Sequence, residues 1–244
     1  MNLILVICSL LVLAQCEDEV VCPEHEASEA VFVEHPRDCR LYYACVGTNP
    51  VLMECPAGLF WDASNSYCNY PELSGCSMEF VKVFSHDTAG GLFSSQADAM
   101  NKNADNPEAD LFSVLDTLEH YRAVRGSSSG SLHLKLCYPE VREGERAQCN
   151  EWLQTSNPAT EAAITGFQAV HLAFPENSWG QAWGGLGRAE KWNRFRTLMD
   201  DSPSTGRWWS AVGATSYSVL QWSTIPGPRK IRVTKVELYA FGKA

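Results

Sequence analysis

The segment CPAGLFWDASNSYC, residues 55–68, places Phe60, Trp61 and Tyr67 among small polar residues between two cysteines. An exposed aromatic ring offers a flat apolar face to the C–H groups of a sugar, and nearby hydroxyl, amide and carboxylate groups can hydrogen-bond to sugar hydroxyls. The same rings could instead form the core of a small domain. If the segment is extended, Phe60 and Trp61 point to opposite faces of a strand, and we expect one to be core and the other exposed.

Ten cysteines are spread unevenly along the 244 residues. Six lie between residues 22 and 76, and two more stand close together as Cys137 and Cys149. Cleavage after Cys16 would remove the remaining two and leave an even number, which in an exported chain predicts full pairing, including a Cys137–Cys149 bond. The uneven density predicts two domains, residues 20–76 and 79–244. The first is so short that its crosslinks must supply much of its stability, about 2–4 kcal/mol each.

The N-terminal sixteen residues, MNLILVICSLLVLAQC, are almost wholly apolar and carry no charged side chain. Ala14 and Cys16 place small residues at the −3 and −1 positions of a cleavage point before Glu17, which predicts a signal peptide over residues 1–16. The apolar run is short for a bilayer span, and acidic residues follow it where an anchor would have Lys or Arg. We therefore expect a secreted, extracellular protein.

Negative charge is concentrated in the first predicted domain. Residues 17–76 contain 11 acidic and 2 basic side chains, whereas the remainder of the chain contains 18 acidic and 17 basic ones. A strongly acidic surface repels phosphate backbones and anionic lipid headgroups. The composition therefore argues against nucleic acid and anionic membranes as partners.

The cysteines of residues 22–76 are separated by 16, 5, 9, 12 and 7 residues and frame the segments DCRLYYAC and CPAGLFWDASNSYC. This pattern closely resembles the type-2 chitin-binding domain of the peritrophin-A family, in which an aromatic pair follows the second cysteine and a CP-x-G-L segment begins at the fourth. The resemblance implies a small twisted sheet with a hairpin between the fourth and fifth cysteines. Spacing alone cannot choose among the pairings that six cysteines allow. The resemblance implies the pairs Cys22–Cys45, Cys39–Cys76 and Cys55–Cys68.

The resemblance also implies binding of chitin, a polymer of N-acetylglucosamine. Its sugar-contacting positions fall on Asp62, Ser64 and Tyr67. Ser64 departs from an aromatic residue found at that place in one member of the family, and Tyr67 is a candidate to replace the lost stacking contact. Trp61 and Tyr70 complete the predicted chitin-binding set, each with core packing as the alternative.

Residues 79–244 are predicted to be mainly β. Their alternating segments are typical of strands separated by Gly, Pro and Ser turns: FVKVF, SLHLKLCY, ITGFQAVHLAF, WWSAVGA and KIRVTKVELYAF. Residues 106–122, NPEADLFSVLDTLEHYR, are expected to form one amphipathic helix, with Asn106 as its N-cap and Pro107 at its first position. We predict a β-sandwich-like domain of the discoidin or jelly-roll kind, with a fibrinogen-like α+β fold as the alternative.

Motifs that could support catalysis or metal binding are incomplete. GSSSG at residues 126–130 fits G-x-S-x-G, but the expected order of helix and strand around it is the reverse of a nucleophile elbow. Asn101, Asn103 and Asp105 alternate as at the start of an EF-hand loop, yet the glycine and the final glutamate of that loop are missing. His86 beside an aspartate lacks an H-x-x-x-H partner. We therefore predict no enzymatic activity, no metal and no cofactor.

Together these features predict a secreted, non-catalytic chitin-binding protein of an extracellular matrix, of the cuticle, peritrophic, shell or mucus type. The expected partners are chitin or other N-acetylglucosamine polymers, with an extracellular matrix protein or a second glycan for residues 79–244. One alternative is an innate-immune lectin that recognises microbial surface glycans. Another is a chitin-tethered enzyme with an unrecognised active site.

Overall fold

The computed structural model describes residues 20–24, 30–91, 93–123, 130–176, 182–188, 199–202, 207–210 and 233–244. The predicted signal peptide and residues 126–129 of the GSSSG segment lie outside these residues. The contacts of the chain divide it into two compact units, an N-terminal one that ends at Gly75 and a C-terminal one that begins at Cys76, with residues 37–39 grouped with the latter. Each unit is described by itself.

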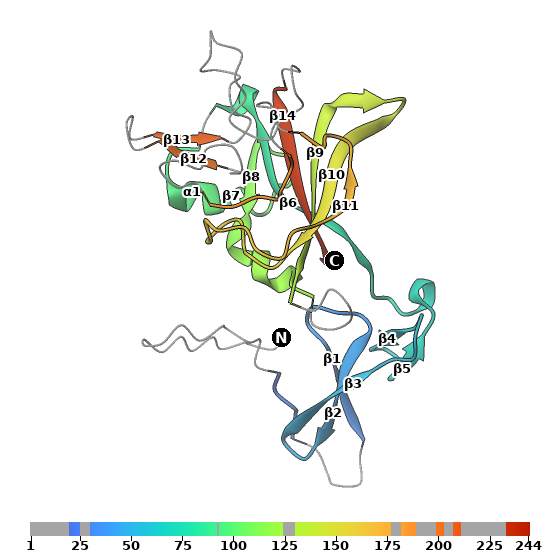
Figure 1. Cartoon of the computed structure of the whole chain (residues 1–244). Helices are drawn as coiled ribbons and strands as arrows, with labels where there is room; N and C mark the ends of the chain where they lie inside the picture. The colour runs from blue at the N-terminus through green and yellow to red at the C-terminus, as the bar shows by residue number, and fades with distance from the viewer. Residues whose placement is uncertain are drawn as a thin grey trace. The chain divides into compact units, whose positions relative to one another are not determined.

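The N-terminal unit contains two small antiparallel sheets (Figure 1). The first has three strands in the order β1-β2-β3, and the second is the β4–β5 hairpin, which a short 3-10 helix, η1, follows. The bounds are β1 (Val31–Glu34), β2 (Leu41–Val46), β3 (Asn49–Glu54), β4 (Phe60–Asp62), β5 (Tyr67–Asn69) and η1 (Pro71–Leu73). Gly47 has a φ of +61° in the two-residue turn between β2 and β3, a left-handed value that glycine adopts without steric cost.

Three disulfide bonds crosslink the residues of the predicted first domain. They join Cys22 to Cys45, Cys39 to Cys76 and Cys55 to Cys68, with Cα–Cα distances of 5.7, 5.8 and 5.6 Å. These are the pairs that the family resemblance implies. Because so few apolar side chains are available in a unit of this size, bonds that restrict the unfolded chain contribute a large share of its stability.

The C-terminal unit is built on one seven-stranded antiparallel sheet with the order β11-β10-β9-β14-β6-β8-β7 (Figure 1). Its strands are β6 (Met78–Asp87), β7 (Asn101–Lys102), β8 (Leu111–Val114), β9 (Leu132–Glu143), β10 (Arg146–Gln154), β11 (Gln168–Leu172) and β14 (Lys235–Lys243). A separate hairpin consists of β12 (Met199–Ser202) and β13 (Arg207–Ser210). The last strand of the chain, β14, pairs with both β6 and β9 and so closes the middle of the sheet.

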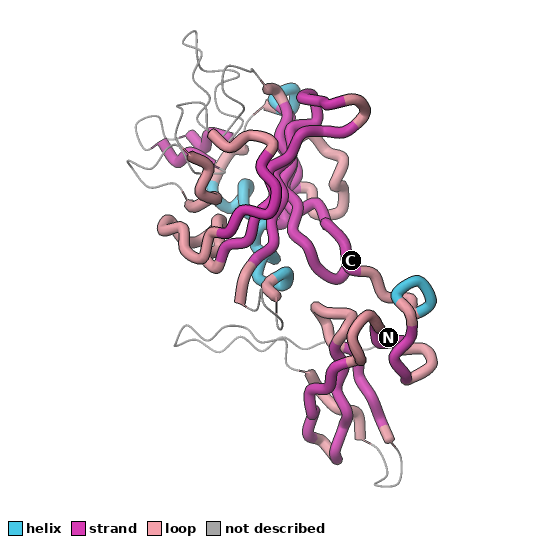
Figure 2. The backbone as a smooth tube through the Cα atoms, turned by 45° about the vertical axis from the view of Figure 1, so that its right-hand side comes forward, coloured by secondary structure: helices cyan, strands magenta, loops and turns pink. Residues whose placement is uncertain are grey.

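Alternation of apolar and polar residues explains which side of this sheet is buried. In β9, Leu132, Leu134 and Leu136 are fully buried, while the intervening His133 and Lys135 are half-buried on the opposite face. The core on the leucine side also takes in side chains from the short helices and from loops: Phe93, Ala99, Leu115, Leu118, Ala159, Trp183 and Leu186. Short helices and loops therefore provide the covering layer that a second sheet would provide in a sandwich (Figure 2).

The prediction of a mainly β protein is confirmed, but the predicted position of the helix is wrong. Within residues 106–122, Leu111–Val114 form strand β8, which pairs with β6, and Leu115–Tyr121 form the 3-10 helix η3. Asn106 caps a turn, since its Oδ1 accepts a hydrogen bond from Glu108 N. Pairing with β6 buries two successive side chains, Leu111 and Phe112, on both sides of the strand, and this tertiary contact outweighs local helix propensity.

The helices of the C-terminal unit are short. The described residues contain one α-helix, α1 (Gln96–Met100), together with the 3-10 helices η2 (Thr88–Gly90) and η3. Ser95 caps α1, because its side chain accepts a hydrogen bond from Asp98 N at 3.1 Å. No helix in the described part of the chain is long and apolar enough to cross a bilayer.

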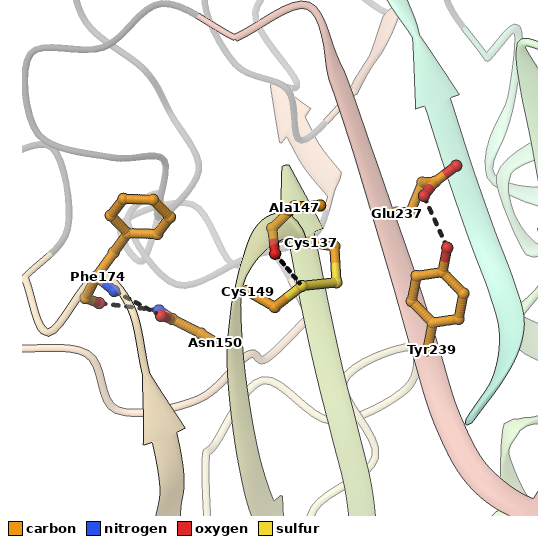
Figure 3. The surroundings of a disulfide bond; sticks show 7 residues. All are labelled: Cys137, Ala147, Cys149, Asn150, Phe174, Glu237 and Tyr239. Atoms are coloured by element: carbon orange, nitrogen blue, oxygen red, sulfur yellow. Dashed lines mark hydrogen bonds between the residues drawn. A yellow bond between two sulfur atoms is a disulfide. The ribbon is translucent and has the colours of Figure 1, made fainter. Parts of the chain in front are cut away.

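Strands β9 and β10 are joined by the predicted Cys137–Cys149 bond, between two residues that lie directly opposite each other in the ladder (Figure 3). Beside it, Asn150 exchanges two hydrogen bonds with the main chain of Phe174, at 2.8 and 2.9 Å. The side chain therefore ties the segment after β11 to β10. The bond and the amide together fix this end of the sheet.

Candidate functional site

The register of the β4–β5 hairpin assigns its side chains to two faces. Phe60 lies opposite Asn69, Trp61 opposite Cys68, and Asp62 opposite Tyr67. Because directly opposed residues of an antiparallel pair share a face and neighbours along a strand alternate, Trp61 and Cys68 lie on one face. We call this the inner face, and the face with Phe60, Asp62, Tyr67 and Asn69 the outer face.

Trp61 belongs to the core of the N-terminal unit and is only 5% exposed. Its ring stacks on Tyr42 of β2 with centroids 4.0 Å apart and contacts the ring of Phe32 at 5.5 Å. The inner face of the hairpin therefore packs on the three-stranded sheet. This corrects the expectation that Trp61 is a sugar platform, because a buried ring has no free face, and it settles which of Phe60 and Trp61 is core. Phe60 is half-buried rather than exposed.

Asp62 shapes the turn of the hairpin and is also buried, with 2% of its surface exposed. One carboxylate oxygen accepts hydrogen bonds from the main-chain N–H groups of Ser64 and Asn65, both at 3.1 Å. The other accepts from the side-chain amides of Asn65 and Asn69, at 2.9 and 3.2 Å. The hydrogen bond from the Asn65 side chain, with help from Asn69, lowers the pKa of Asp62 against the opposing effect of burial. Protein donors thus surround both carboxylate oxygens of Asp62, which the sequence predicted to contact the sugar directly.

The other three predicted site residues are exposed. Ser64 lies at the tip of the turn, and Tyr67 and Tyr70 are 50% and 62% exposed. Leu73 of η1, which sequence reasoning did not select, is 63% exposed. The hairpin and the segment that follows it thus present two aromatic rings and one aliphatic side chain to solvent.

Asn69 connects these residues and was also missed at the level of sequence. Its side-chain amide donates to Tyr67 Oη and Asp62 Oδ2, both at 3.2 Å, while its carbonyl oxygen accepts from Tyr70 N at 2.9 Å. One asparagine therefore fixes the hydroxyl end of Tyr67 and the main chain of Tyr70. The signal that could have identified it is the two-residue spacing from Tyr67, which places both side chains on the outer face of one strand.

The metal-ligand candidates of the C-terminal unit are tied into the fold. Asn101 Nδ2 donates to Asp116 at 2.7 Å, and Asn103 Nδ2 donates to the main-chain oxygen of Leu111 at 2.7 Å. His86 is fully buried, and its Nε2 donates to the Gly91 carbonyl at 2.8 Å. Within the described ranges, no group of three or more His, Cys, Asp or Glu side chains is arranged to hold a metal ion.

Comparison with known proteins finds matches for the N-terminal part of the chain. Residues 22–76 match the model of the chitin binding peritrophin-A domain, which agrees with the disulfide pairs and the hairpin described above. Over 55 residues the chain is 38% identical to Peritrophin-1 of Anopheles gambiae, a match that covers 22% of this chain and 36% of that protein. The chain thus spans about a third of the length of this curated relative. No solved structure matches the chain.

Proposed function

We propose that residues 22–76 bind chitin or other polymers of N-acetylglucosamine through the outer face of the β4–β5 hairpin. The observation that carries this proposal is the half-exposed ring of Tyr67, which Asn69 holds in place on the side of the hairpin opposite to Trp61. A fixed aromatic ring can stack on the C–H face of a sugar without losing much side-chain entropy on binding. Support also comes from the peritrophin-A match over the same residues.

The hydrogen bond from Asn69 also sets the polarity of the Tyr67 hydroxyl. Because Tyr67 Oη accepts from the Asn69 amide, its own proton is free to be donated to a ligand oxygen, such as the carbonyl of an acetamido group. Ser64 adds a second exposed hydroxyl, and Tyr70 adds a second ring. In this proposal Trp61 and Asp62 act indirectly, by holding the hairpin on the sheet and by shaping its turn.

We further propose that the protein is extracellular and works without catalysis, as a chitin-bound component of an extracellular matrix. Four disulfide bonds fit an oxidising compartment outside the cell. The C-terminal unit would then engage a matrix protein or a second glycan. Turnover of chitin oligomers by the purified chain would contradict the non-catalytic part of this proposal.

The test of the binding site is a set of substitutions in the full chain, read out by pelleting with insoluble chitin. Tyr67→Ala is expected to weaken binding by about 1–2 kcal/mol, the scale of a lost stacked ring and its buried area. Tyr67→Phe keeps the ring and removes only the hydroxyl, so it should retain most of the affinity. Val170→Ala, at an exposed position of β11, is the matched control and should bind like the unmodified chain. Unchanged binding of Tyr67→Ala would place the site elsewhere.

A further inference from the structure

The three-stranded sheet of the N-terminal unit has one face that is rich in exposed apolar side chains. The ladder pairs Phe32 with Ala44 and Ala44 with Val51, while Tyr42 pairs with Met53. Opposed residues share a face, and residues two apart on one strand share it as well. Four members of this face are exposed large hydrophobic residues: Phe32 (37%), Val46 (65%), Val51 (44%) and Met53 (40%). We call these four residues the apolar shelf.

The shelf is more than the scattered apolar exposure of an ordinary protein surface. Nine large hydrophobic residues of the described chain are exposed, and eight of them precede Cys76, although the C-terminal unit is much larger. Three of the eight are Tyr67, Tyr70 and Leu73 of the proposed hairpin site, and four form the shelf. Contiguous exposed apolar surface of this kind is typical of a binding surface.

The shelf is continuous with the hairpin that carries the proposed sugar site. Trp61, on the inner face of the hairpin, covers the Tyr42 part of the sheet face and contacts the edge of the shelf at Phe32, with ring centroids 5.5 Å apart. Phe32 therefore touches the hairpin on one side and belongs to the uncovered face on the other. The shelf and the hairpin therefore adjoin each other at Phe32.

Charge indicates which occupant fits the shelf. Among the residues on this sheet face, Glu34 is the one charged side chain, whereas residues 17–76 as a whole carry 11 acidic and 2 basic residues. Packing two copies shelf to shelf would bring two strongly acidic units together, which mutual repulsion opposes. An uncharged polymer incurs no such repulsion. Branched side chains on a sheet can pack on its C–H and acetyl-methyl groups with little loss of conformational entropy, and the flexible thioether of Met53 can adapt to an irregular apolar surface.

We propose that the apolar shelf is a second chitin contact that adsorbs to neighbouring chains in packed, insoluble chitin, while the hairpin recognises a single chain. This inference rests on the proposed function of the hairpin. The two surfaces make different demands on the ligand. A soluble oligomer offers one chain and fills only the hairpin site, whereas an insoluble fibre offers many adjacent chains and engages the shelf as well.

The test compares insoluble chitin with soluble chitohexaose, using the full chain and the double variant Val51→Thr/Met53→Gln. These replacements keep side-chain size and net charge, and both positions are at least 40% exposed, so the fold is preserved. The variant is expected to bind insoluble chitin about three- to tenfold more weakly. The reason is that two partly exposed side chains would no longer bury apolar surface against the polymer. Its affinity for chitohexaose should stay within about twofold of the unmodified chain. Val170→Thr, with 52% exposure on β11, is the matched control.

Each other outcome overturns the proposal in an identifiable way. Equal affinity of variant and unmodified chain for insoluble chitin would remove the shelf from chitin binding. A parallel loss for chitohexaose would make it part of the single-chain site. A dimer of the unmodified chain in sedimentation that the variant abolishes would identify a second copy as the occupant. Failure of the unmodified chain to bind either form of chitin would refute the proposed function of the hairpin itself.

Discussion

Tyr42 and Trp61 lie face to face, with ring centroids 4.0 Å apart and ring planes inclined by 11°, although they belong to two different sheets. This stack, together with the contact between Trp61 and Phe32, joins the β4–β5 hairpin to the three-stranded sheet. It holds the inner face of the hairpin on the sheet, whereas Tyr67 on the outer face is exposed to solvent. Packing of Trp61 on the sheet therefore positions the hairpin so that the ring of Tyr67 is exposed.

The first prediction follows from this division of roles. Trp61→Ala is expected to lower the free energy of unfolding by about 3–5 kcal/mol. A unit this small should then lose its native packing. Because disulfide bonds keep even an unfolded chain compact, the measurement is the near-UV circular dichroism of the aromatic residues together with urea unfolding. Tyr70→Ala, at a 62% exposed position, is the control and should change stability by no more than about 0.5 kcal/mol. A Trp61→Ala protein with native packing and lost chitin binding would return Trp61 to the ligand site.

The second prediction concerns acid. Hydrogen bonds from Asn65 and Asn69 lower the pKa of Asp62 in the folded hairpin, so the ionised carboxylate stabilises the fold. A group whose pKa is lower in the folded state contributes stability above its unfolded pKa, about 3.9, and loses it as the pH falls through the folded value. Hairpin order and chitin binding should thus be constant between about pH 7 and 5 and decline below about pH 4.

The measurement is the pH dependence of chitin binding alongside the NMR signals of the Tyr67 ring. Asp62→Asn keeps an acceptor oxygen but cannot ionise, so it should weaken binding at neutral pH and flatten the acid limb. Glu72→Gln, which removes a carboxyl of η1 that is not in the turn, is the control. An unchanged acid limb in Asp62→Asn would assign the pH dependence to another group.

The sequence predicted the fold of the N-terminal unit well because its signals are local or covalent. Six cysteines and the CPAGL segment led, through the family resemblance, to the correct pairs and to the hairpin. Alternation predicted that the side chains of Phe60 and Trp61 would lie on opposite faces of the strand. Which of the two is buried depends on a contact with Tyr42, nineteen positions earlier in the sequence. Periodicity within a strand carries no information about that partner.

The C-terminal unit shows the same limit more strongly. Its β strands were recognisable from alternation. Leu111, Leu115 and Leu118 have the apolar spacing of a helix, yet residues 111–114 form a strand because β6 pairs with them. Periodicity survives in η3, where Leu115 and Leu118 are both buried. Asn69 was missed for a comparable reason, because its importance comes from the residues across and beside it rather than from its own type.

The third prediction is that chitin binding depends little on salt. The ligand is uncharged, and the proposed contacts are aromatic rings and hydrogen bonds. Salt screens interactions between charges, over a length of about 10 Å at 0.1 M ionic strength, and so should have little effect on the affinity for chitin. Affinity measured from low to moderate sodium chloride should change by less than about twofold. Chitosan, the deacetylated cationic polymer, is the matched comparison. A steep loss for chitin itself would indicate that the acidic surface of residues 17–76, and not the hairpin, dominates binding.

The last prediction concerns the buried His86 of the C-terminal unit. Its Nε2 donates to the Gly91 carbonyl, its Nδ1 has no hydrogen-bond partner among the described residues, and Phe93 packs against the ring at 5.7 Å. Burial lowers the pKa of His86, although the Gly91 carbonyl and the neighbouring Asp87 oppose this effect. The folded state therefore holds the imidazole neutral.

Because the folded pKa of His86 lies below the unfolded value of about 6.5, its effect on stability is absent above that pH. Stability should fall as the pH drops below about 6.5, by up to about 1.4 kcal/mol per pH unit, until the folded pKa is reached. Calorimetry of the full chain between pH 7 and 5 measures this, as a decrease in the Tm of the transition assigned to the C-terminal unit. His86→Gln keeps a donor for Gly91 and cannot titrate in this range, so it should reduce the slope, whereas the exposed His171→Gln should not. The same slope in His86→Gln and in the unmodified chain would show that other groups control the response to acid.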